Sequence, residues 1–364
     1  MKIKNIKCNC GSFCEDFVIF LAFFTIFLSV YLSPNNILGD ILWLYHMILK
    51  MINGYMPYRD INMIVTPFTF QVAEVFMKIF GDGAFVYYIC MSLLGSAFII
   101  TVRMVLKEMS KSKILNLCFM IAFVFLASTI FIYCYNVMTI HFIFLTIFFE
   151  LKKEEQDRKA YDYLIGLMLG LSAASKQTIG GLAIVFSLLY DLYKRKYLKK
   201  HEEKRSVLRK TLGILTIAIP YLIWLLINDS LMPFLDQCIF SIFEFGEKNK
   251  VGDFFNYYTV LPIIFTSISV CLSFIKRFKS MPEYEKMTML TFYTVPTLFI
   301  IMPIVNSYHC ALMLIASFPL MAFYINLFFE NKLVKINNAS WIAFLMFLGY
   351  TFIICRMFYR QVEL

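Results

Sequence analysis

The stretch FVIFLAFFTIFLSVYLS, residues 17–33, contains no charged side chain, and nearly all of its residues are apolar. A helix of about 17–25 such residues can cross the hydrocarbon core of a bilayer, which is about 30 Å thick. Ten further runs of this kind follow, and two of them, residues 137–151 and 161–175, are short. The eleven runs are residues 17–33, 85–106, 114–134, 137–151, 161–175, 178–193, 211–228, 256–275, 287–304, 309–329 and 339–355. They predict an all-α integral membrane protein with about eleven transmembrane helices.

The composition of the 364-residue chain agrees with this prediction. The chain is 60% apolar, 18% aromatic and only 16% charged, and its mean hydropathy is +0.72. Soluble proteins average about 45–50% apolar and about 25% charged residues. The composition therefore excludes a soluble enzyme with a single core and a disordered chain. Since no internal repeat, heptad or biased linker divides the sequence, we expect one polytopic domain over residues 1–364.

The basic residues predict the orientation of the chain. A twelfth apolar run, 66–80, carries Glu74 and Lys78, and a charge at the bilayer centre costs about 2.5–3.5 kcal/mol. We expect this run to lie at the membrane interface. With a cytoplasmic N-terminus, 26 of the 34 Lys and Arg residues then lie inside and 8 outside, as the positive-inside rule requires. We therefore expect a multi-pass protein of the cell membrane with its C-terminus outside, and the net charge of +10 does not indicate a nucleic-acid partner.

The ten cysteines do not indicate a disulfide framework, because six of them lie in or at the ends of apolar runs, where a free cysteine behaves as a small apolar residue. The segment CNCGSFC, residues 8–14, holds three cysteines, but no fourth ligand follows at a spacing typical of zinc sites. No Asp-x-Asp pair occurs in the segments expected outside. We therefore expect no cofactor and no divalent metal ion.

The first loop expected outside, residues 34–84, is too long for a simple connection. Within it, DILWLYHMILKMI at 40–52 repeats apolar side chains at helical spacing, which predicts an amphipathic helix on the outer membrane face. Gly39 and Asp40 open this helix and Gly54 closes it. Asp40 can be interpreted as a helix cap, or as a carboxylate that acts as general base for a hydroxyl acceptor.

Several short motifs follow one another along the chain. They are Gly39-Asp40, Gly54, Pro57-Tyr58-Arg59-Asp60, Pro67 and Gly81 in the first loop, Gly170-Leu171 followed by Ser175-Lys176-Gln177-Thr178, and Asn306-Ser307-Tyr308-His309. Together they resemble the GT-C superfamily of polytopic glycosyltransferases, which take sugars from polyprenyl-phosphate donors. The resemblance extends over the whole architecture and supports the superfamily better than any subfamily.

The resemblance implies roles for five side chains. Asp40 matches the acidic residue that accepts the proton of the attacking acceptor as the anomeric carbon of the donor is displaced. Lys176, His309 and Arg59 are expected to bind the donor phosphate, because a cation stabilises the charge of the leaving group in the transition state. Asp60 is the second candidate for an acidic site residue.

Each of these side chains also has a simpler interpretation. Lys176 could extend to lipid headgroups, His309 could hydrogen-bond a neighbour, and Arg59 could pair with the adjacent Asp60. The chain also departs from the superfamily at Asn136, since many members carry an acidic residue in the second outer loop.

The function predicted in this way is transfer of a sugar, hexose or pentose, from a polyprenyl-phosphate donor to a lipid-linked or cell-envelope glycan on the outer face. The other sizeable outer loop, 229–255, has an apolar middle that predicts another interfacial helix. The chain ends nine residues after the last apolar run, which fits a small or lipid-linked acceptor. The alternatives are an oligosaccharide polymerase or ligase, and a lipid or polysaccharide transporter or flippase without catalysis. The sequence does not show the large basic central outer loops expected of a polymerase or ligase. It also does not show the related halves expected of a transporter or flippase.

Overall fold

The computed structural model describes residues 10–33, 39–110, 112–127, 132–156, 158–198, 204–241, 244, 257–274, 283–302 and 306–330. Within these ranges the chain is helical and contains no β-strand. The all-α class expected from the apolar runs is therefore confirmed.

The first half of the chain contributes seven of the described helices. They are α1 (Cys10–Leu32), α2 (Gly39–Ile52), α3 (Phe68–Phe80), α4 (Ala84–Met109), α5 (Lys113–Ala127), α6 (Tyr135–Gln156) and α7 (Ala160–Ser175). The amphipathic helix expected at 40–52 is α2, and Gly54, just beyond its end, has a φ of 88°, a conformation that glycine adopts without strain.

The second half contains shorter and more irregular helices. They are α8 (Gln177–Tyr197), α9 (Lys204–Ile227), α10 (Leu231–Leu235), the π-helix η3 (Asp236–Phe240), α12 (Tyr257–Phe274), α13 (Tyr284–Thr294), the 3-10 helix η5 (Val295–Ile301), α14 (Ser307–Ala316) and α15 (Phe318–Glu330).

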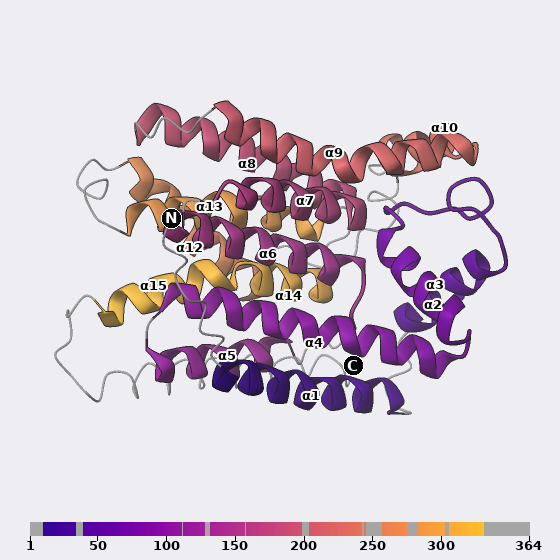
Figure 1. Ribbon diagram of the computed structural model, residues 1–364, viewed down its shortest axis with the longest axis horizontal. Helices are drawn as coiled ribbons and strands as arrows, with labels where there is room; N and C mark the ends of the chain where they lie inside the picture. The colour runs from indigo at the N-terminus through magenta and orange to yellow at the C-terminus, as the bar shows by residue number, and fades with distance from the viewer. Residues whose placement is uncertain are drawn as a thin grey trace.

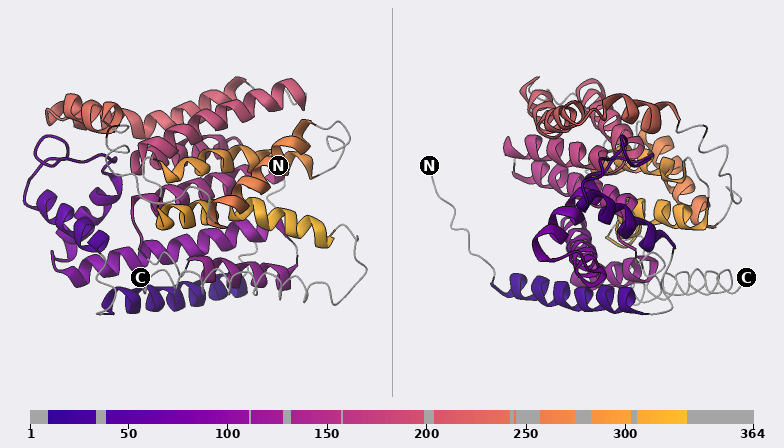
Figure 2. Two further views of the ribbon diagram at one scale, coloured as in Figure 1. Left: turned by 180° about the vertical axis from the view of Figure 1, so that it is seen from behind. Right: turned by 90° about the vertical axis from the view of Figure 1, so that its right-hand side faces the viewer.

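Most of the helices lie side by side with their axes nearly parallel (Figure 1). The short helices α2 and α3 lie together at one end of this bundle, the right-hand end in Figure 1 and the left-hand end in the view from behind in Figure 2. The helix α10 lies at the same end. The bundle therefore has one end covered by the loop between α1 and α4 and by the segment after α9.

The run 66–80 forms the 13-residue helix α3, which is about 20 Å long and too short to cross a hydrocarbon core of about 30 Å. Its charged residues pair with each other, since Lys78 Nζ lies 2.7 Å from Glu74 Oε1.

Two proline residues divide the apolar runs at 287–304 and 309–329. Pro296 lies at the start of η5, where the chain changes from an α-helix to a 3-10 helix, and Pro319 is the second residue of α15. Proline lacks the N–H that continues an α-helix. The axes of α14 and α15 consequently form an angle of 45° at Ser317.

The number of transmembrane helices is not confirmed. Within the described residues, four helices are long and apolar enough to cross a membrane, and a fifth span results if α14 and α15 are taken as one. They are Phe13–Leu32, Ala84–Met109, Tyr135–Glu154, Arg205–Ile227 and the pair Tyr308–Ala316 with Phe318–Leu327. The expected run at 339–355 lies outside the described residues. The outer faces of α1 and α9 are apolar and exposed, for example at Phe17, Leu212 and Ile223, as a lipid-facing helix requires.

The helix α4 ends, and the helices α7 and α9 begin, at the end of the bundle opposite α2 and α3 (Figure 1). Several ion pairs involve residues near these helix ends. They join the ends of neighbouring helices through Arg103 and Asp16, Lys152 and Glu108, Arg209 and Asp162, and Lys210 and Glu150. The four basic residues belong to the groups that the charge distribution assigns to the cytoplasm.

Candidate functional site

Lys176 lies in the break between α7 and α8. Its backbone is extended, with φ −149° and ψ 109°, so that α7 ends at Ser175 and α8 begins at Gln177. The two helices form a hairpin in which Ala173 and Gly180 lie against each other. Lys176 is 4% exposed, so its side chain enters the bundle and does not extend to lipid headgroups.

The ammonium group of Lys176 is held by neutral groups. Its Nζ donates hydrogen bonds to Asn136 Oδ1 at 2.7 Å and to the carbonyl oxygen of Ile300 at 3.5 Å, and it lies 6.0 Å from the ring centroid of Tyr135. No carboxylate of the described residues forms an ion pair with it. A buried cation without a compensating charge is costly, and burial lowers the pKa of Lys176 from its ordinary 10.5 to about 8.

Asn136 connects Lys176 to His309. It is the second residue of α6 and is 1% exposed, and its Nδ2 lies 3.5 Å from His309 Nε2. His309 lies in the first turn of α14, where its backbone N–H donates to the capping side chain of Asn306 at 2.8 Å. The structure thus brings Lys176 and His309 together on either side of Asn136.

Arg59 and Asp60 form a separate pair. Arg59 donates from Nε to Asp60 Oδ1 at 3.0 Å and from Nη2 to Oδ2 at 2.9 Å, and its Nη1 reaches the carbonyl oxygen of Asn228 at 3.5 Å. Asp60 Oδ2 also accepts from the backbone N–H of Met56. The hydrogen bond from Arg59, followed by that from Met56, lowers the pKa of the Asp60 carboxyl. None of these contacts involves Lys176. The expected roles of Arg59 in phosphate binding and of Asp60 as an acidic site residue therefore stay predictions.

Asp40 is the second residue of α2, within the first helical turn. Its side chain lies outside the described residues. Its role as general base is therefore a prediction that rests on the sequence.

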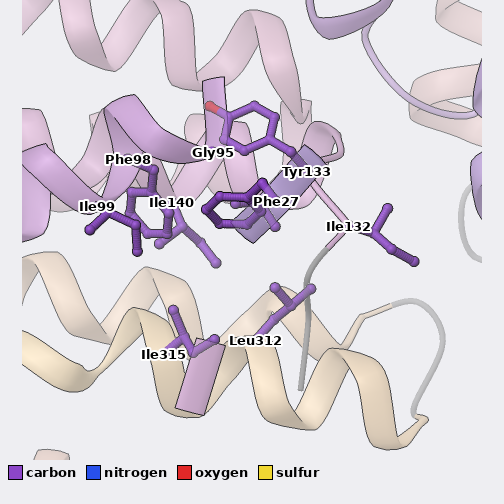
Figure 3. A pocket seen from close by; sticks show the side chains of 10 residues that line it. Phe27, Gly95, Phe98, Ile99, Ile132, Tyr133, Ile140, Leu312 and Ile315 are labelled. Atoms are coloured by element: carbon purple, nitrogen blue, oxygen red, sulfur yellow. The ribbon is translucent and has the colours of Figure 1, made fainter. Parts of the chain in front are cut away.

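An apolar cavity is lined by the same two helices that carry Asn136 and His309 (Figure 3). Val137 and Ile140 of α6 and Leu312 and Ile315 of α14 contribute to its wall. The other lining residues are Phe27 of α1, Gly95, Phe98 and Ile99 of α4, and Ile132 and Tyr133. The cavity thus shares α6 and α14 with Asn136 and His309, and Lys176 contacts α6 through its hydrogen bond to Asn136.

Two further residues of this region, Asn136 and Gln177, already appear among the sequence features above, but the sequence predicts no contact for either of them. Asn136 is the nearest partner of Lys176, and Gln177 binds backbone groups of the first loop. The position of Asn136, a polar residue at the start of an apolar helix, is a sequence signal for its contact. Gln177 has no such signal, because its partners are more than 60 positions away in the sequence. Within the described residues, no group of three His, Cys, Asp or Glu side chains could hold a metal ion.

Comparison with known proteins supports the resemblance. Residues 65–224 match the model of the dolichyl-phosphate-mannose-protein mannosyltransferase family. The fold is similar to that of ArnT from Cupriavidus metallidurans bound to undecaprenyl phosphate, with a TM-score of 0.61 and 14% identity over 94% of this chain and 64% of that one. The apo form of the same protein gives a TM-score of 0.60 and 14% identity over 92% and 62% of the two chains.

The chain thus spans less than two thirds of the length of the solved structures that it matches. No curated protein matches it. The family match over residues 65–224 agrees with the resemblance to GT-C membrane glycosyltransferases that the motifs predict, and the solved structures show a similar fold.

Proposed function

We propose that this chain is a membrane glycosyltransferase that takes a sugar from a polyprenyl-phosphate donor, and that Lys176 and His309 bind the donor phosphate. The observation that carries the proposal is the ammonium group of Lys176, which is buried and held by the neutral side chain of Asn136. The same asparagine also contacts His309. A phosphate would supply the anionic partner that the buried cation lacks among the described residues. The walls of the neighbouring cavity, which α6 and α14 help to form, are apolar, as a site next to an isoprenoid chain requires.

The reaction follows from these assignments. A hydroxyl oxygen of the acceptor forms a bond to the anomeric carbon of the donor, while the bond from that carbon to the phosphate oxygen breaks. The proton of the hydroxyl passes to the carboxylate of Asp40, and polyprenyl phosphate leaves with the electron pair. The ammonium of Lys176 stabilises the charge that develops on the leaving phosphate. Arg59 is a further candidate for binding the donor phosphate. Asp60, which is held ionised by Arg59, is the second candidate for the general base.

The similarity to ArnT supports the choice of lipid, since the solved structure of that protein contains undecaprenyl phosphate. The acceptor we propose is a lipid-linked or cell-envelope glycan on the outer face. The family model supports sugar transfer in general, and both hexoses and pentoses are consistent with the site.

Binding of undecaprenyl phosphate to the purified protein tests the phosphate site. We expect Lys176→Met to weaken binding by about 10- to 100-fold, because a hydrogen bond to a charged group contributes about 1.5–3 kcal/mol. Thr178→Val is the matched control, since Thr178 lies two positions away and its buried hydroxyl has no hydrogen-bond partner in the described part of the chain. Equal affinities of wild type and Lys176→Met would contradict the assignment.

Mass spectrometry of lipid extracts tests the transfer step. A strain without the chain should accumulate a glycan that lacks one sugar, and the wild-type chain should restore it. Asp40→Asn should insert, fold and bind undecaprenyl phosphate, but should not restore the glycan. Uptake of lipid or glycan into proteoliposomes without a covalent product would support a transporter instead.

A further inference from the structure

A loop segment of the chain is held in place by two glutamine side chains from distant helices. This segment, residues 56–66, lies between α2 and α3 and is called the clasped segment below. Gln177, the first residue of α8, donates from Nε2 to the carbonyl oxygen of Ile64 at 2.7 Å, and its Oε1 accepts from the backbone N–H of Thr66 at 3.2 Å. The hydroxyl of Thr66 donates to the carbonyl oxygen of Ala173 in α7 at 3.1 Å. The segment is thus attached to the α7–α8 hairpin.

The second glutamine attaches the same segment to η3. Gln237 Oε1 accepts from the backbone N–H of Met63 at 2.9 Å, and its Nε2 donates to the carbonyl oxygen of Tyr58 at 2.8 Å. Gln177 also reaches η3, because its Nε2 lies 3.2 Å from the carbonyl oxygen of Cys238. The thiol of Cys238 lies 3.5 Å from the carbonyl oxygen of Met63. Three segments far apart in the sequence are therefore connected through two amide side chains.

The clasped segment contains a strained residue. Tyr58 has a φ of 69°, a conformation that costs a bulky residue about 1–3 kcal/mol and persists only where surrounding contacts enforce it. Its hydroxyl donates to the carbonyl oxygen of Val65 at 3.0 Å and lies 3.1 Å from the hydroxyl of Tyr221. Its ring packs on that of Phe234. The conformation of the segment thus depends on contacts with the hairpin, α9 and α10.

Gln177 directly follows Lys176 at the break between α7 and α8, but the two side chains bind different partners. Lys176 binds Asn136 inside the bundle, whereas Gln177 binds the clasped segment and η3. We propose that Gln177 is a positioning residue, which fixes the clasped segment relative to Lys176 so that sugar transfer can occur. This inference rests on the proposed function for the transfer step. Its structural part, the attachment of the segment, does not depend on that function.

Gln177→Ala removes all three hydrogen bonds of this amide, and Gln237→Ala removes the two on the other side of the segment. Thr178→Val is the control at the helix break. The native thiol of Cys238 reports on the attachment, because it is 1% exposed and lies against Met63. Its alkylation by a maleimide in the purified full-length protein is followed by peptide mass spectrometry.

We expect alkylation of Cys238 to become at least about tenfold faster in Gln177→Ala and in Gln237→Ala, and to stay unchanged in Thr178→Val. In the variant that carries both substitutions, the increase in the alkylation rate should be smaller than the product of the two single increases, because both amides hold the same segment. The affinity for undecaprenyl phosphate should stay within about twofold of wild type, whereas the glycan product in cells should fall at least about tenfold. A residue that only stabilises the fold would lower affinity and product together.

The outcomes separate this inference from the proposed function. If the wild-type chain restores the glycan and Gln177→Ala restores it equally, Gln177 is not a positioning residue, although the transferase assignment stands. If alkylation of Cys238 is the same in wild type and both variants, the attachment itself is refuted. If alkylation accelerates as expected but the wild-type chain makes no product, the transferase assignment fails and the attachment stands.

Discussion

At the scale of single residues, the charge of Lys176 decides what the site can bind. A lysine with only neutral partners binds an anion through its full charge, whereas a lysine paired with a carboxylate would first have to give up that partner. Asn136 supplies the neutral partner here, with its Oδ1 at 2.7 Å. An asparagine at this position, which departs from the GT-C pattern that the motifs resemble, thus favours binding of a phosphate.

The lowered pKa of Lys176 predicts a pH dependence of ligand binding. Lys176 is charged below a pKa of about 8 and neutral above it, while a phosphate monoester, with a second pKa near 6, keeps its charge. The dissociation constant for undecaprenyl phosphate should therefore rise about fivefold between pH 8 and pH 9 and change little between pH 7 and pH 7.5. Titration of the purified protein at each pH measures it.

Asn136→Asp is the control for this titration. A carboxylate beside Nζ keeps the lysine protonated to higher pH, so the rise of the dissociation constant should move above pH 9. The affinity at pH 7.5 should fall, because the carboxylate competes with the phosphate. An unchanged profile in this variant would show that another group causes the dependence.

At the scale of secondary-structure elements, the α7–α8 hairpin places Lys176, and a single glycine allows the two helices to meet. A Cβ atom on Gly180 would lie 2.2 Å from the backbone nitrogen of Ala173, whereas a Cβ atom on the neighbouring Gly181 would meet nothing within 4 Å. Both glycines lie in the first two turns of α8. They provide a matched pair in which the change is identical and only the surroundings differ.

We expect Gly180→Ala to separate the hairpin, to destabilise the protein by roughly 1–3 kcal/mol, as overpacking does, and to weaken binding of undecaprenyl phosphate by moving Lys176. Gly181→Ala should be neutral, or stabilising by up to about 1 kcal/mol, because alanine is the better helix former. Thermal unfolding in detergent and the binding titration measure both effects. Equal behaviour of the two variants would mean that the hairpin does not depend on this close approach.

The elements that the sequence predicts well are those set by local patterns. The amphipathic run at 40–52 and the apolar run at 85–106 are helices, because hydrophobic periodicity and apolar length act within a single segment. The break at Ser317 was missed although Pro319 is visible in the sequence, because apolar composition alone does not show where a helix bends.

The candidate site was predicted only in part, for a related reason. Lys176 and His309 stand out as polar residues at the ends of apolar runs, and the structure places both beside Asn136. The partners of Gln177 are backbone groups of Ile64 and Cys238, and no side-chain pattern marks a backbone group as a partner. Long-range contacts of this kind require the folded chain.

At the scale of the whole molecule, polar groups gather at two ends of the bundle. One end carries the Lys176 site and the clasped segment, and the other holds a buried cluster in which Lys210 Nζ lies 2.8 Å from Glu150 Oε1 and 2.9 Å from Asp191 Oδ1. The helix α8 begins next to Lys176 and contains Asp191 fourteen residues after its first residue, so the two polar regions are about 20 Å apart along it. Changes in one region should therefore leave the other intact.

We expect Lys210→Met to destabilise the protein by about 3–5 kcal/mol, because it leaves the buried carboxylates of Glu150 and Asp191 without their nearest cation. Adding Glu150→Gln should recover part of the loss by removing one of the two charges. Lys78→Met is the control: it breaks an ion pair whose lysine is 52% exposed, and such pairs contribute about 0–1 kcal/mol. Thermal unfolding in detergent gives the three values.

Since the cluster lies far from Lys176, the folded fraction of Lys210→Met should bind undecaprenyl phosphate as wild type does. A loss of binding in that fraction would show that the two ends of the bundle are coupled.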